Sequence, residues 1–187
     1  MIKLPKGIRI PNGNEYPNGY VVEGFQYKIK NASRWSYVAR ISIDADKFWS
    51  IFDELSNKLL IRGKARGMIG FKEEQPEVGK QKKVQDILSD LSNYRYELLN
   101  DGYIEFGITD YNKKSFCQIY VNNYKTIMVF GNKIETLLEI MLNNGIDEIK
   151  DLKVINDFPV VSEALCEEDG LHYTQVIEEI KEKICKE

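Results

Sequence analysis

Histidine is almost absent from this 187-residue chain, which has one, His172, and only three cysteines. A single histidine excludes multi-histidine metal sites and makes any histidine-dependent nucleophilic scheme rest on that one residue. His172 stands at the start of a predicted helix, where we expect a surface or capping role. The cysteines Cys117, Cys166 and Cys185 are odd in number and lack metal-ligand spacing, which favours reduced thiols in a cytoplasm. We therefore predict no catalytic, cofactor or metal site.

Long hydrophobic runs are also lacking. No stretch of about 18 apolar residues occurs, so the sequence predicts no transmembrane span and no membrane partner. The first residues, MIKLPKGIRIP, lack the apolar centre of a signal peptide. No internal repeat or low-complexity tract is found. These absences predict a cytoplasmic location.

The length and composition are those of one globular domain. Hydrophobic residues make up 43% and charged residues 29% of the chain, values that are ordinary for a soluble fold. Three of the five prolines fall in residues 1–19, which we interpret as an N-terminal arm or lead-in. Residues 20–187 are expected to form a single domain, with 103–145 as its core unit.

The core unit has the clearest pattern. Period-2 alternation predicts strands at 103–111, 114–121 and 124–130, and short polar connections favour an antiparallel meander. In the third strand Ile127 and Met128 point to opposite faces, and both faces are apolar. This is typical of a central strand that is covered on both sides.

A helix is predicted at 132–145, after the third strand. Asn132 is the expected cap, Glu135 can complete a capping box, and Gly145 suits the left-handed position past the end. The apolar stripe that should pack on the sheet is Ile134, Leu137, Leu138 and Met141.

The remaining segments supply partners for this unit. Residues 61–79 lose periodicity and are rich in glycine, which indicates an extended connection with at most a short strand near 68–71. Elsewhere the patterns predict strands at 20–29, 35–43 and 152–155, and helices at 44–58, capped by Asp44, at 80–100 and at 173–184. The fold class is α+β: an antiparallel sheet with about four packing helices.

Residues 62–67, with the sequence RGKARG, mix cations with glycines. Arg62, Lys64 and Arg66 are candidate phosphate contacts, because glycine lets a backbone approach an anion and the cations supply charge. The order is that of neither a Walker A loop nor a dinucleotide fingerprint. A solvated basic loop is the plainer interpretation. A small enzyme or ligand-binding domain that uses this loop is our alternative function.

Charge is divided along the sequence. Residues 1–83 carry 16 Lys and Arg against 9 Asp and Glu, whereas residues 84–187 carry 10 against 20. The acidic half contains a poorly periodic segment with Glu163, Glu167, Glu168 and Asp169 before the last helix. These acids fit a solvated loop whose negative charges interact favourably with the dipole of the following helix, or a contact with a basic partner. Direct nucleic-acid binding is not predicted, because the whole chain is acidic and carries no recognised motif.

Three short stretches give a family likeness over residues 102–159. They are Gly102–Gly107 (GYIEFG), Tyr124–Ile127 (YKTI) and Asn156–Pro159 (NDFP). With the order meander, helix, acidic segment and final helix, the chain resembles small immunity proteins of bacterial polymorphic or contact-dependent toxin systems. The resemblance implies a non-enzymatic inhibitor of one cognate toxin, without shared catalytic residues. A basic, nuclease-type toxin is then the expected partner, with the four acids as its contact. The oligomeric state and the role of residues 1–83 stay open.

Overall fold

The computed structural model describes residues 2–11, 21–31, 34–166 and 168–185. Within them a seven-stranded antiparallel sheet has the order β2-β3-β8-β7-β6-β4-β5, and a second sheet pairs β1 with β9. The strands are β1 Ile8–Arg9, β2 Gly24–Ile29, β3 Tyr37–Ser42, β4 Lys64–Phe71, β5 Glu77–Lys83, β6 Ile104–Tyr111, β7 Phe116–Val121, β8 Ile127–Gly131 and β9 Val161–Ser162. The helices are α1 Phe48–Leu59, α2 Val84–Ser92, α3 Arg95–Asn100, α4 Ile134–Asn143 and α5 Tyr173–Cys185, with a 3-10 turn at Ile155–Asp157.

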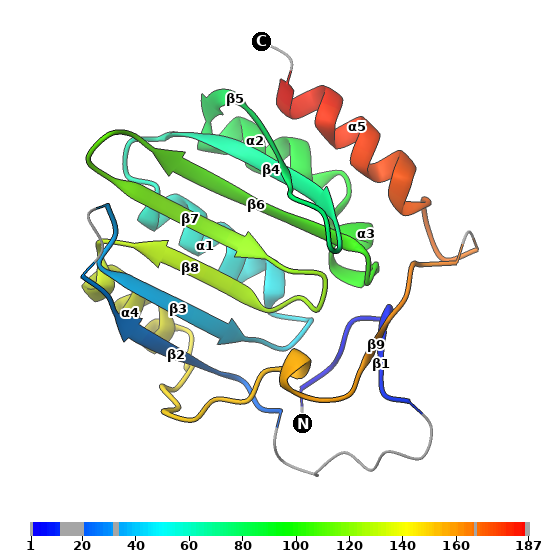
Figure 1. The fold of residues 1–187 in the computed structure, drawn as a ribbon, viewed down its shortest axis with the longest axis horizontal. Coiled ribbons are helices and arrows are strands. Elements are labelled where there is room, and N and C mark those ends of the chain that lie inside the picture. Colours follow the sequence, from blue (N-terminus) through cyan, green and yellow to red (C-terminus); the bar gives the residue numbers. More distant parts are fainter. Residues whose placement is uncertain (1, 12–20, 32–33, 167, 186–187) are drawn as a thin grey trace.

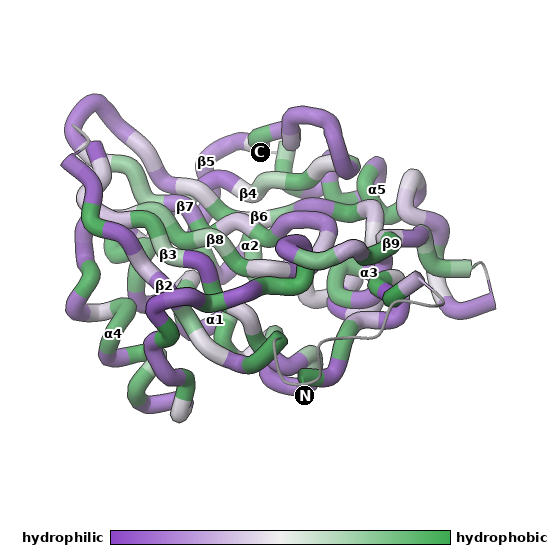
Figure 2. The backbone as a smooth tube through the Cα atoms, turned by 60° about the horizontal axis from the view of Figure 1, so that its bottom comes forward, coloured by the Kyte–Doolittle hydropathy of each residue, from purple (hydrophilic) through white to green (hydrophobic). Residues whose placement is uncertain are grey.

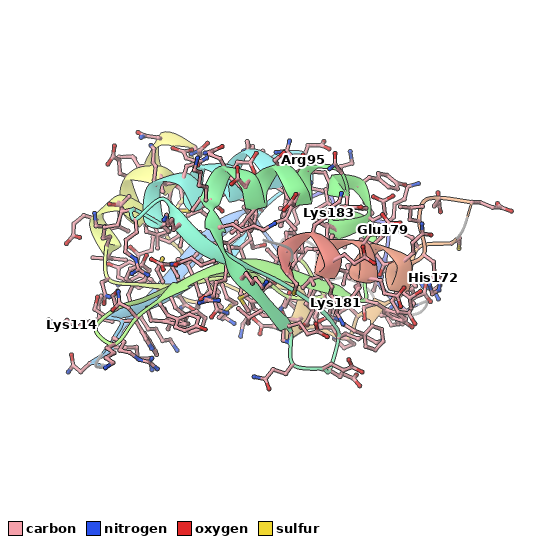
Figure 3. All side chains as sticks on the ribbon, turned by 90° about the horizontal axis from the view of Figure 1, so that it is seen from above. Arg95, Lys114, His172, Glu179, Lys181 and Lys183 are labelled. Atoms are coloured by element: carbon pink, nitrogen blue, oxygen red, sulfur yellow. The ribbon has the colours of Figure 1, made fainter. Side chains whose placement is uncertain are left out.

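The predicted α+β class with an antiparallel sheet in one domain is confirmed. Figures 1 and 3 show the helices gathered on one side of the large sheet. In Figure 2 the hydrophobic stretches run through strands and helices, and the connecting turns are mostly hydrophilic. Within each strand, successive side chains alternate between the face that the helices cover and the opposite face.

The meander of β6, β7 and β8 is confirmed, and β8 lies inside the sheet between β3 and β7. Ile127 is 0% exposed on the helix-covered face. The predicted cover on both faces is wrong, because Met128 and Phe130 are only half-buried on a face that carries no helix. On this face the apolar side chains pack against one another. The ring of Phe130, for example, contacts the rings of Trp35 and Phe116.

The irregular connection predicted at 61–79 is wrong: β4 and β5 form an antiparallel hairpin there, with one shift of register between Arg66 and Met68. Two of its glycines serve close packing. A Cβ at Gly67 would lie 2.8 Å from the Ile184 side chain of α5, and one at Gly79 would lie 2.5 Å from the Ile184 carbonyl oxygen. Glycine at these positions lets α5 lie directly on the hairpin. These two glycines, which interrupt the hydrophobic alternation of residues 61–79, are therefore places where a helix packs on a strand, and they do not mark a loop.

The helix predicted at 80–100 is also wrong in extent. Lys80–Lys83 continue β5, paired with the start of β4, and the helical part is broken between α2 and α3. At the break Tyr94 is buried and its hydroxyl donates to Glu179 of α5 at 2.6 Å. Tertiary pairing has overridden the local helical pattern at both points.

Two predicted helix caps differ from the structure. Asp44 lies before α1, where its carboxylate accepts hydrogen bonds from the backbone N–H groups of Lys3 and Asp46, each at 2.9 Å. Asn132 donates its side-chain amide to the Arg34 carbonyl, and α4 begins without a side-chain cap. Gly145 has the expected left-handed backbone past α4, with φ 66°.

The segment after α4 is not the edge strand predicted at 152–155. The Leu152 carbonyl accepts from the Arg40 guanidinium at 2.7 Å, and the chain then makes the 3-10 turn. The chain enters the second sheet at β9. Residues 2–11 of the predicted N-terminal arm also pack on the domain, since Gly7 N–H donates to Asn100 O at 2.7 Å and β1 pairs with β9. The rest of that arm lies outside the described residues.

Candidate functional site

A groove runs between α5 and the turn of the β4–β5 hairpin, with a volume of about 320 Å³. Figure 3 shows Lys181 on the side of α5 near this turn, with His172 at the start of the helix. The lining residues come from both elements: Ile69, Gly70, Phe71, Glu74, Gln75, Glu77, Tyr173, Thr174, Ile177, Glu178 and Lys181. We call this feature the α5 groove.

The hairpin side of the α5 groove is held in place by backbone bonds. Glu74 N–H donates to the Phe71 carbonyl at 3.1 Å, and Lys72 N–H donates to the Tyr103 carbonyl at 2.8 Å. Glu73 between them takes a left-handed conformation with φ 68°, which is uncommon for a residue with a side chain. The turn is therefore fixed against β6 and presents its acidic side chains at a defined place.

Three aromatic rings lie beside the groove. Phe71 stacks on Tyr173 with ring centroids 5.2 Å apart, and Tyr103 meets both rings edge-on at 5.5 and 5.4 Å. The ammonium group of Lys72 lies 3.9 Å from the Tyr103 centroid. A cation over an aromatic face is attracted by the quadrupole of the ring. This cluster therefore already binds one cation of the chain itself.

Carboxylates dominate the charge of the groove. Glu77 forms an ion pair with Lys181 at 2.6 Å, and both side chains are partly exposed. Within the part of the chain that the structure describes, Glu74 and Glu178 have no ion-pair partner. Three acids against one base leave the lining with a net charge of about −2. Unpaired carboxylates beside aromatic rings suit a cationic group with an apolar stem, such as an arginine or lysine side chain.

Comparison of the chain with models of known protein families, with curated proteins and with solved structures finds no match.

Of the four acids predicted as a partner contact, Glu163, Glu168 and Asp169 do not line the α5 groove. Glu163 forms an ion pair with Arg9, and Asp169 pairs with Lys6 at 2.7 Å. Glu168 is exposed, and Glu167 lies outside the described residues. The hydrogen bond from Lys6 to Asp169 raises the pKa of that lysine above its ordinary value. The structure thus brings two of the acids to cations of the N-terminal segment.

The cations predicted as phosphate contacts do not converge on one point. Arg62 donates through two nitrogens to Asp110, on the helix-covered side of β6. Arg66 projects from the opposite face of the sheet, where it donates to Gly79 O at 3.2 Å and lies over the Tyr111 ring. Lys64 is exposed at the start of β4. Much of the predicted loop is thus strand.

His172 has the expected surface and capping position. It is exposed, and its Nδ1 lies 2.8 Å from Thr174 Oγ1 and accepts from the Thr174 N–H at 3.4 Å. All three cysteines are free thiols, and burial raises the pKa of Cys117 to about 12. Among the described residues, no group of three or more His, Cys, Asp or Glu side chains is placed to hold a metal ion.

Sequence reasoning missed the groove because it depends on a hairpin that was not predicted. One signal was available on α5, where Tyr173, Ile177 and Lys181 recur every four residues and so share one face. The position of Glu74 opposite this face could not be read from the sequence. No helix in the described parts of the chain is long and apolar enough to cross a membrane.

Proposed function

We propose that the protein is a non-enzymatic immunity-type inhibitor, which binds a basic bacterial toxin through the α5 groove. The proposal is carried by two carboxylates, Glu74 and Glu178, that have no ion-pair partner among the described residues and line the groove beside the rings of Phe71, Tyr103 and Tyr173. Aromatic residues are enriched where protein interfaces have their strongest contacts. The carboxylates supply the charge complement to a basic partner.

A nuclease-type toxin fits these features well. Such an enzyme needs positive surface to hold phosphate groups, so an acidic inhibitor can occupy the place of its substrate and associate rapidly. In this proposal an arginine or lysine of the toxin enters the α5 groove, between Glu74 and Glu178. Its aliphatic stem then packs on Tyr173. The family likeness of residues 102–159 supports the same class, and the inhibitor acts in the cytoplasm.

The test uses the protein product of any toxin gene that adjoins this gene. Association is measured by stopped flow at two salt concentrations, for wild type and for the double variant Glu74→Lys, Glu178→Lys. Reversing two charges at the contact should slow association by about tenfold or more at low salt and weaken its salt dependence. The same variant should lose protection in cells that express the toxin.

The matched control changes the same charge elsewhere. Glu135→Lys, Glu139→Lys alters two exposed acids of α4, away from the groove, and should bind almost as wild type does. A third variant, Glu168→Lys, Asp169→Lys, tests the acidic segment before α5. Slower association for that variant alone would move the interface to the segment. If no adjoining toxin binds the wild-type protein, the proposed function is wrong.

A further inference from the structure

A second cavity lies at the other end of the sheet, with a volume of about 170 Å³. Its walls come from the start of β3, the end of α1 and the turn between β6 and β7. The lining residues are Tyr37, Leu59, Ile61, Arg62, Asp110, Ser115, Phe116, Cys117, Gly131, Asn132 and Lys133. None of them belongs to the α5 groove. Ile61 is 63% exposed, so an apolar side chain stands at the surface beside the cavity.

The hydroxyl of Tyr37 is the unusual group in this wall. Tyr37 is 0% exposed, and its Oη has no hydrogen-bond partner among the residues that the structure describes. A Cβ at Gly131 would lie only 3.0 Å from this oxygen, so glycine there leaves room for the end of the ring. Buried hydroxyl groups are nearly always hydrogen-bonded in folded proteins. A donor without a described partner in the wall of a cavity can meet an acceptor that enters, once the side chains that cover its oxygen move aside.

The protonation of the wall supports binding rather than reaction. Burial raises the pKa of the Tyr37 hydroxyl, so it keeps its proton and acts as a donor at neutral pH. Burial likewise holds the Cys117 thiol in its protonated form, with a pKa of about 12, and only thiolates are good nucleophiles. Its Sγ already faces the Leu59 carbonyl at 3.8 Å.

Two of the three charged groups of the wall are paired with each other. Arg62 and Asp110 form a two-nitrogen ion pair with each other, and this pairing raises the pKa of Arg62 above its ordinary value. Lys133 is exposed to solvent. The inner wall thus offers apolar contact from Leu59, with Ile61 at the rim, together with the hydroxyl of Tyr37 as a donor.

We propose that this cavity binds a small neutral molecule with a planar apolar body and a single carbonyl-type acceptor, which accepts the Tyr37 hydroxyl proton. An apolar cavity of about 150 Å³ is large enough for benzene, so a molecule of about nine non-hydrogen atoms fits the volume here. The site is independent of the α5 groove and does not rest on the proposed function.

The experiment compares two probes of equal shape, acetophenone and α-methylstyrene, in which a methylene group replaces the carbonyl oxygen. Binding to the full-length protein is measured by ligand-observed NMR titration. Acetophenone should bind wild type about tenfold more tightly than α-methylstyrene, as expected for one hydrogen bond to a donor that is otherwise unpaired. The variant Tyr37→Phe removes only the hydroxyl and should bind both probes equally.

A second variant tests the location. Cys117→Leu adds two non-hydrogen atoms to the cavity wall and should weaken both probes by at least about fivefold, because the free volume is small. Circular dichroism spectra of both variants confirm the fold. Equal affinity of the two probes for wild type would overturn the role of Tyr37. Failure of acetophenone to bind wild type, or unchanged binding to Cys117→Leu, would overturn the site itself.

Discussion

The two faces of the seven-stranded sheet share one backbone but differ in what covers them. The helix-covered face carries fully buried side chains such as Phe106, Ile119 and Ile127. The open face carries half-buried aromatic residues, methionine and arginine, among them Phe130 and Arg40. Neighbouring residues along a strand thus stand in two environments. Most of the fully buried apolar side chains lie on the helix-covered face, whereas the open face also carries polar and charged groups.

The largest expected difference is between two neighbours in β8. Ile127→Asp places an unpaired carboxylate in the apolar core and should cost more than about 4 kcal/mol, a large part of the usual 5–15 kcal/mol of domain stability. Met128→Asp points to the open face opposite Arg40 and should cost less than about 1 kcal/mol. Urea denaturation followed by circular dichroism measures both. A soluble Ile127→Asp variant with the wild-type melting temperature would contradict the assignment of the faces.

The next comparison uses one residue type on both faces. Phe106 lies among the rings of Phe48, Trp49 and Phe52, so Phe106→Ala should destabilise by about 3–5 kcal/mol. Phe130→Ala loses only its contacts at the open face, at about 1–2 kcal/mol. The free energies of unfolding in guanidinium chloride decide between them. Equal losses would mean that the open face packs as tightly as the core.

Lys125 is the exception on the helix-covered side. It is the only lysine or arginine among the described residues that is buried, at 5% exposure, and its ammonium donates to the Ile104 carbonyl at 2.6 Å. Desolvation lowers its pKa from 10.5 to about 7, although the negative charges of Asp101 and Glu105 act to raise it. Between these two values the unfolded chain binds a proton that the folded protein does not, so stability rises with pH across this window.

Lys125→Met tests this coupling. The wild-type protein should gain up to about 1.4 kcal/mol per pH unit relative to the variant between pH 7 and pH 9.5, and nothing further should change below the folded pKa. Urea unfolding of both proteins at a series of pH values measures the difference. A stability difference that stays constant with pH would show that the lysine keeps its charge inside the fold.

The smallest effect is expected at the edge of the open face. Val78 of β5 is 45% exposed, opposite Met68 of β4, so Val78→Lys should change stability by less than about 0.5 kcal/mol. Thermal unfolding at two protein concentrations checks this expectation. A loss that grows with concentration would indicate that another copy covers this face.

Local pattern alone determined much of the fold. Alternation placed β6, β7 and β8 and the buried side of Ile127, and the four-residue spacing placed α5, because each pattern reflects which side chains must leave water. The family likeness and the charge division gave the functional class, which stays a proposal.

Tertiary packing decided the rest. Gly67 and Gly79 resemble loop residues in the sequence, yet they permit α5 to lie on the β4–β5 hairpin and so create the α5 groove. Glu74 and Glu178 are about one hundred positions apart, and the sequence carries no signal that joins them. The unpaired hydroxyl of Tyr37 and the lowered pKa of Lys125 likewise depend on burial by distant segments. Periodicity reports which side of an element avoids water, whereas only the packed chain decides which elements meet there.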